Sequence, residues 1–263
     1  QHVPAILMSI PVSNFKFEFV ATYNAGANKL ADIGSSFDPL ASFQNLVLPG
    51  PSSLSANYLR PSNEFEYFAS LHHSFNGGDI SLVFSDENLN QRTLKDITTT
   101  SLSNTLHFGY DRVKMIGISG NLASGHYLLK YEGAQIQGVS IPGQDPSMLP
   151  WQNKNQTLLA LGSDYTGLDN LTLGIETDAK IIQDYTEDLK GKNTSVGYSI
   201  HARWAGLNDL LSINGAISRL NGEKSMISSL AANYSVIDGL SIGGRLVRYQ
   251  ANSVTDSFFP YKN

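Results

Sequence analysis

The chain has 263 residues, no cysteine, a net charge of −5 and only 16% charged residues. The absence of cysteine excludes disulfide scaffolds, thiolate metal sites and a cysteine nucleophile. The mildly acidic balance argues against a nucleic-acid surface, which would need clustered Lys and Arg. No apolar run approaches the ~18 residues of a membrane-spanning helix, which excludes a helical membrane protein.

Apolar and polar residues alternate along most of the chain, as in Phe15-Lys16-Phe17-Glu18-Phe19. Successive strand residues point to opposite faces, so this alternation predicts strands with one apolar and one polar face. In chain order, the predicted strands are 2–10, 14–23, 64–75, 79–88, 104–122, 126–137, 155–165, 171–184, 194–204, 210–220, 225–234 and 240–252. Several reach the ~9–11 residues that a tilted strand needs to cross a bilayer.

Short and long connections follow one another in almost strict alternation. The short ones carry Gly, Pro, Asn or Asp and are 11–14, 76–78, 123–125, 166–170, 205–209 and 235–239. The long ones are 24–63, 89–103, 138–154 and 185–193, and a tight link at 221–224 breaks the pattern. Outer-membrane barrels have short periplasmic turns and longer external loops, and this arrangement predicts such a barrel.

An aromatic residue ends the strand before three of the short turns, at Tyr165, Trp204 and Tyr234. Rings at a common height would form the aromatic girdle at one membrane interface. The alternative is an ordinary aromatic-and-turn habit of antiparallel sheets.

If the apolar side chains of these strands face lipid, the side chains at the alternate positions line a lumen. The predicted pore-lining residues are Lys16, Glu18, Glu64, Glu66, Lys130, Glu132, Glu176, Asp178, Lys180, Arg203 and Arg245. Their mixed charge predicts no strong selectivity by sign. A soluble barrel would reverse the two faces. With about twelve strands, however, it would enclose more volume than side chains can fill, which favours the membrane barrel.

Three features are irregular. The apolar parity shifts at Asp111-Arg112, which predicts a β-bulge near the rim. Link 24–63 contains Phe37, Phe43 and residues 46–48, and we expect it to fold into the mouth or to pack on a neighbouring subunit. Both chain ends fall on the external side, which predicts further strands at each end and fourteen or more in the intact barrel. The alternative is a closed twelve-strand barrel.

Chemical motifs are scarce. No phosphate-binding glycine loop or nucleophile elbow is present. His72 and His73 would point to opposite faces of a strand, so they cannot share a metal ion. His126 and His201 are weaker candidates for catalysis than for pore lining. We therefore expect no catalytic residue, no metal site and no cofactor.

Long amphipathic strands, girdle aromatics and short Gly/Asp turns make the chain resemble a Gram-negative porin. More narrowly, Phe17-Glu18-Phe19-Val20, the segment 33–39 and the segment 112–117 are similar to an uncharacterised family of proteobacterial outer-membrane barrel proteins. The resemblance spans most of the chain. It implies a barrel that exports or takes up an apolar compound, and it assigns no role to any residue.

Together these features predict one β-barrel domain over 1–263 that forms a passive outer-membrane channel for small solutes and is not an enzyme. The alternatives are an outer-membrane lipase or protease, a plugged transporter or structural barrel, and a soluble all-β binding protein. The expected partners are the lipid bilayer, lipopolysaccharide and a small permeant, with a homo-oligomer or other envelope proteins as further candidates and no nucleic acid.

Overall fold

The computed structural model describes residues 4–23, 54–61, 64–100, 104–144, 151–220, 222 and 224–251, and this part of the chain is all β. The strands are β1 (Ala5–Val12), β2 (Phe15–Tyr23), β3 (Leu54–Tyr58), β4 (Phe65–Phe75), β5 (Gly78–Thr99), β6 (Asn104–Ser124), β7 (Tyr127–Ile141), β8 (Gln152–Leu168), β9 (Leu171–Ile182), β10 (Thr194–Gly206), β11 (Leu211–Arg219), β12 (Met226–Ile237) and β13 (Leu240–Gln250).

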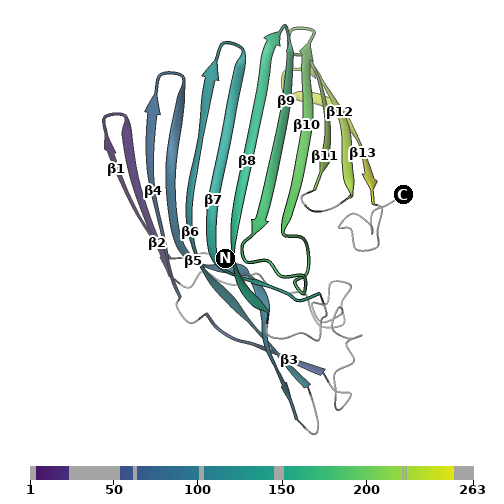
Figure 1. Ribbon diagram of the computed structural model, residues 1–263. Coiled ribbons are helices and arrows are strands. Elements are labelled where there is room, and N and C mark those ends of the chain that lie inside the picture. The colour runs from purple at the N-terminus through teal and green to yellow at the C-terminus, as the bar shows by residue number, and fades with distance from the viewer. Residues whose placement is uncertain are drawn as a thin grey trace.

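Twelve of the strands form an up-and-down antiparallel sheet in the order of the sequence, with only β3 left out of the succession. The sheet is curved, and the six short turns β1–β2, β4–β5, β6–β7, β8–β9, β10–β11 and β12–β13 lie at one end, opposite the β11–β12 link (Figure 1). We call this the short-turn end, and the opposite end the long-link end. Left-handed residues such as Gly77 (φ 86°) and Asn170 (φ 61°) make these turns possible, because Gly and Asn tolerate that conformation.

The pairing register gives the sheet two chemically different faces. It connects Lys16 to His72, Ser81, Ser119, Glu132, Ala160 and Asp178 across seven strands, all on one face. We call this the polar face. The residues of the opposite parity, among them Phe17, Ile118 and Ile175, form the apolar face and are exposed. The predicted alternation is thus kept in register across the whole sheet.

The sheet is open rather than closed. Among the described residues, β1 pairs only with β2 and β13 only with β12. The twelve predicted strand segments are confirmed, but the closed twelve-strand barrel is wrong, because the first segment is a paired strand that does not reach the last. The fourteen or more strands of an intact barrel stay a prediction.

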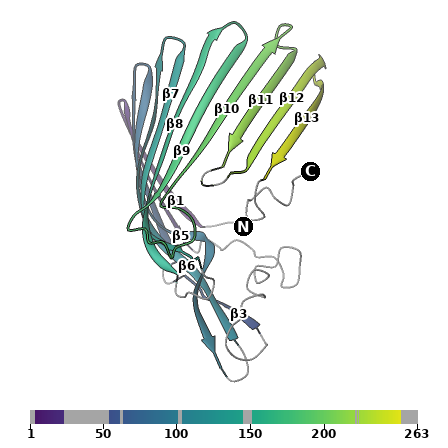
Figure 2. The same cartoon turned by 45° about the vertical axis from the view of Figure 1, so that its right-hand side comes forward.

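Three of the predicted long links contain strand, although 138–154 contains it only at its ends, in β7 and β8. The link 89–103 was expected to be a loop, but β5 continues to Thr99 and pairs with the first part of β6. Within the link 24–63, β3 pairs in parallel with β6. We call β3, β5 from residue 89 and β6 up to residue 112 the extension, which projects from the long-link end (Figure 2). The apolar residues expected at 37, 43 and 46–48 lie outside the described residues.

The extension has its own small apolar core, which explains why the alternation changes there. Leu94, Leu106 and Phe108 are buried against one another, with Trp151 packed against them. The β-bulge was predicted at Asp111-Arg112 of β6, but the structure has it on the paired strand β5. The pairing with β6 breaks between Asn88 and Arg92 of β5, while β6 itself runs through without interruption.

A second bulge, in β7, shifts its register with β8 between Ile136 and Val139. Gly138 occupies it with a φ of 89°, and a Cβ atom there would lie 2.9 Å from the Arg112 carbonyl oxygen. A side chain at this position would be strained by both its backbone conformation and this contact.

We therefore expect Gly138→Ala to destabilise the extension by about 1–2 kcal/mol. The measurement is urea unfolding followed by Trp151 fluorescence in a Trp204→Phe background. Gly244→Ala is the matched control, because a Cβ there meets nothing within 4 Å. Equal midpoints for the two variants would contradict the strain argument.

Candidate functional site

The polar face carries a charged network over three neighbouring strands. Lys130 Nζ of β7 lies 3.1 Å from Asp164 Oδ2 of β8 and 2.9 Å from Glu176 Oε1 of β9. One cation thus holds two carboxylates that would otherwise repel each other. All three side chains are partly exposed, so the network is accessible to solvent.

Two glycines let side chains lie across the strands in this network. A Cβ on Gly174 would lie 2.1 Å from the His201 ring, which reaches over this residue until its Nε2 is 3.5 Å from Asp164 Oδ1. A Cβ on Gly162 would lie 3.0 Å from Cγ of Glu176. These two glycines therefore allow the side chains of His201 and Glu176 to lie flat across the polar face.

Further predicted residues lie on the same face towards β1. Lys16 and Glu18 form an ion pair at 2.7 Å. Glu66 is only 5% exposed and accepts hydrogen bonds from Thr22 Oγ1 at 3.2 Å and from the backbone N–H of Asn88 at 3.0 Å. Glu64 precedes β4 and lies outside the strand.

The other predicted pore-lining residues also share the polar face. Glu132, Asp178, Lys180, Arg203 and Arg245 all have its parity in the register. Arg203 and Arg245 lie in β10 and β13, away from the Lys130 network. The structure thus brings Lys130, Glu176 and His201 together and leaves the two arginines apart from them.

The histidines behave as the strand geometry predicts. His72 is on the polar face, with Nδ1 2.8 Å from Ser81 Oγ and Nε2 3.0 Å from Ser74 Oγ. His73 is on the apolar face and stacks on Phe15 with ring centroids 4.2 Å apart. In the described part of the chain, no three His, Cys, Asp or Glu residues are placed to hold a metal ion.

The three predicted girdle residues lie on the apolar face near the short turns. Trp204 and Tyr234 are 37% and 42% exposed, and Tyr165 is partly exposed. Tyr127, which the pattern did not single out because it follows a turn, pairs with Tyr165 at a centroid distance of 4.9 Å. His126 lies in the turn beside them, with its ring edge-on to Tyr165.

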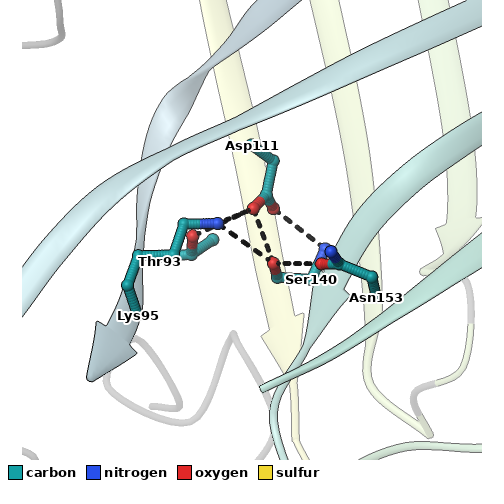
Figure 3. Close-up of polar contacts among 5 residues, drawn as sticks. All are labelled: Thr93, Lys95, Asp111, Ser140 and Asn153. Carbon is teal, nitrogen blue, oxygen red and sulfur yellow. Dashed lines mark hydrogen bonds and ion pairs between the residues drawn. The ribbon is translucent and has the colours of Figure 1, made fainter. Parts of the chain in front are cut away.

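A buried polar cluster joins the extension to the main sheet (Figure 3). Asp111 is 1% exposed and is paired with Lys95 Nζ. Its carboxylate accepts hydrogen bonds from the Ser140 amide at 2.9 Å, from Ser140 Oγ at 2.5 Å and from Thr93 Oγ1 at 3.2 Å. Asn153 Oδ1 lies 2.9 Å from the same Ser140 hydroxyl.

These contacts satisfy the Asp111 carboxylate. Burial by itself would raise the pKa of Asp111, but the hydrogen bonds from Lys95 and Ser140 outweigh it and hold the pKa below its usual range. The cluster links β5, β6, β7 and β8 at the point where β5 bulges, so its role is to anchor the extension.

Sequence patterns did not single out Asp164 or the Asp111 cluster. Asp164 alternates in step with Ala160 on the polar face of β8, so the alternation within this strand could have found it. The contact between Lys95 and Ser140 spans 45 residues and depends on register shifts in both β5 and β7, so no local pattern could have found it.

No protein-family model matches this chain, and no curated protein matches it either. Across the described residues, no helix is both long enough and apolar enough to cross a membrane.

The Asp111 cluster predicts a pH dependence. Because the pKa of Asp111 is lowered on folding, its contribution is present above the unfolded carboxyl value of about 3.9 and is lost as the pH falls through the folded value. We expect Asp111→Asn to destabilise the extension by about 1–3 kcal/mol at pH 7 and to remove part of its acid sensitivity.

The measurement is the urea midpoint of Trp151 fluorescence at pH 7 and pH 3, in the Trp204→Phe background. Asp96→Asn, at an exposed position of the neighbouring strand β5, is the control and should leave both midpoints unchanged. If the Asp111→Asn protein were as acid-sensitive as the parent, Asp111 would not be the titrating group.

Proposed function

We propose that this chain forms part of the wall of an outer-membrane β-barrel, with the apolar face against lipid and the polar face around a water-filled lumen. Small solutes pass passively through this lumen. The observation that carries the proposal is the separation of apolar and charged side chains onto the two faces of one antiparallel sheet, which holds along each described strand from the short turns to the first charges of the apolar face. The resemblance to Gram-negative barrels noted in the sequence agrees with it.

The distribution of buried residues supports this proposal. Among the described residues, the buried hydrophobic side chains gather at the long-link end or in the extension: Leu94, Leu106, Phe108, Val113, Ile141, Ile182, Leu189 and Ala251. Elsewhere the apolar face is exposed, with Leu161 at 62% and Ile175 at 55%. A soluble protein rarely exposes so large a contiguous apolar area, whereas lipid would cover it.

The height of the apolar band also supports the proposal. Within the described strands, the apolar face has no Asp, Glu, Lys or Arg near the short turns. The first charges are Asp86, Arg219 and Arg248, each the ninth residue of its strand from the short turn, and Lys114 on β6. Eight steps of ~3.4 Å, tilted by ~40°, rise about 20 Å, close to the ~25 Å band of such barrels. Asp111 and the extension lie beyond this band.

The polar wall suits hydrated solutes. Its charges are paired or face solvent, so they can orient a permeant without making or breaking bonds. The proposed partners are the bilayer, lipopolysaccharide and the permeant. The open edges at β1 and β13 make a second copy or another envelope protein a further candidate partner.

An outer-membrane hydrolase is the second candidate, because His72 lies 2.8 Å from the Ser81 hydroxyl. A catalytic histidine of this type is usually oriented by a third group at its other nitrogen. Here that nitrogen contacts the Ser74 hydroxyl, which makes the pair a weaker basis for function than the two-faced sheet. Labelling of the protein by a fluorophosphonate, lost in Ser81→Ala, would favour the hydrolase.

The direct test is single-channel conductance of the full-length protein in a planar bilayer. We expect steady current steps whose size rises with salt concentration, because a water-filled lumen conducts ions. A protein that inserts correctly but stays silent would contradict an open channel and favour a plugged transporter or a structural barrel. Extraction from membranes without detergent would favour the soluble alternative.

A matched pair of substitutions tests which face meets lipid. We expect Ile118→Arg to weaken folding into vesicles by about 2–4 kcal/mol, because it places a charge on the apolar face inside the band. The neighbouring Ser119→Arg points to the polar face beside Glu132 and should cost much less. The measurement is urea unfolding from phospholipid vesicles, and equal losses for both variants would contradict the assignment of the faces.

A further inference from the structure

Two arginines share one register row on the polar face of the last four strands. Arg203 of β10 pairs with Asn214 of β11, Asn214 with Ala231 of β12, and Ala231 with Arg245 of β13. Three strand spacings of ~4.8 Å separate the two arginines, so their Cα atoms are about 14 Å apart. A guanidinium can extend from each side over the residues between them.

The surface between the two arginines is hollowed. Together with Asn214, Asn233 and His201, the arginines line an open hollow of about 670 Å³ whose remaining lining residues are Ala, Ser and Gly. The side chain of Asn233 lies over Gly243, its partner on β13, because a Cβ on Gly243 would lie 1.9 Å from the Asn233 Oδ1 atom. Two amide side chains and two guanidinium groups therefore border a space of small-molecule size.

The positive charge in this hollow is not neutralised by the neighbouring wall. In the described residues of β10 to β13, the polar face has no Asp or Glu. On the adjoining strands, Asp164 already contacts Lys130 and His201. Glu176 contacts Lys130 and lies opposite Ser199, four residues before Arg203.

The charges on the polar face are therefore segregated. The carboxylates, most of them paired or hydrogen-bonded, lie on β2 to β9, while β10 to β13 present only Arg203, Arg245 and His201. The mixed composition predicts a polar face without preference for either sign, but the strand order gives β2 to β9 charges of both signs and leaves β10 to β13 with positive charges alone. One side of the wall favours anions.

We propose that this hollow binds small organic anions through their carboxylate or phosphate groups, and that it sets a preference for such solutes. The planar guanidinium fork matches the two oxygens of a carboxylate or phosphate. The Asn214 and Asn233 amides supply neutral donors for the remaining oxygens. The preference for permeating anions rests on the proposed channel function, whereas binding in the hollow does not.

The first test measures binding by the full chain in neutral detergent, using isothermal titration with succinate and, separately, inorganic phosphate. We expect Arg203→Gln and Arg245→Gln each to weaken binding about tenfold, and the double variant to abolish it. Stronger binding of one probe than the other identifies whether carboxylate or phosphate is the preferred group.

Arg248→Gln is the matched control, because Arg248 is on the same strand as Arg245 but has the opposite parity and lies on the apolar face. It should bind both probes like the parent. Failure of both probes to bind the parent, or equal losses in Arg245→Gln and Arg248→Gln, would overturn the proposed site.

The second test measures the reversal potential of the reconstituted protein in a KCl gradient. We expect the parent to favour chloride over potassium, and the double variant to lose this preference while Arg248→Gln keeps it. Binding without conductance would contradict the channel but leave the site intact. Conductance with no binding, and with no change of selectivity in the double variant, would contradict the site alone.

Discussion

The structure depends on one constraint, the backbone hydrogen-bond ladder that keeps twelve strands in register. Since strand side chains alternate with period two, a slip of one residue in any strand would exchange its two faces. The register instead holds Lys16, Glu132 and Asp178 on one face from β2 to β9. Apolar residues such as Ile118 and Ile175 consequently form a single surface that the described part of the chain does not cover. The need for an external apolar environment, and hence the proposed place in a membrane, follows from this arrangement.

The same ladder builds the polar wall. Lys130 can hold Asp164 and Glu176 because the register puts Lys130 and Glu176 in one row on either side of Gly162, with Asp164 two residues further along β8. Glycines at 162 and 174 give Glu176 and His201 the room to lie across the strands. Small residues in β11 to β13 have the opposite effect, since they leave a hollow that the two arginines border. The side-chain sizes along a row therefore decide where the wall is filled and where it can hold a solute.

Much of the fold could be predicted from the alternation and the turn residues. The twelve strand segments, the grouping of short turns at one end, and the opposite directions of His72 and His73 were all expected and are present. The extension was not expected, because β5 beyond residue 88 has little alternation and pairs with β6 only after a bulge. The Asp111 cluster was missed for the same reason, as its members are brought together by register shifts in β5 and β7 and not by a periodic pattern.

By itself, the sequence determined the strand period, the parity of each charged residue and the positions of the turns, because these depend on neighbours in the chain. Only the tertiary structure decided that the sheet is open, that the extension carries its own core around Leu94 and Phe108, and that Arg203 and Arg245 lie in one row. These features depend on the register between strands, which is set by bulges and long-range packing. The composition gives only the number of charged residues. The order and register of the strands place the carboxylates of the polar face on β2 to β9 and the two arginines on β10 and β13.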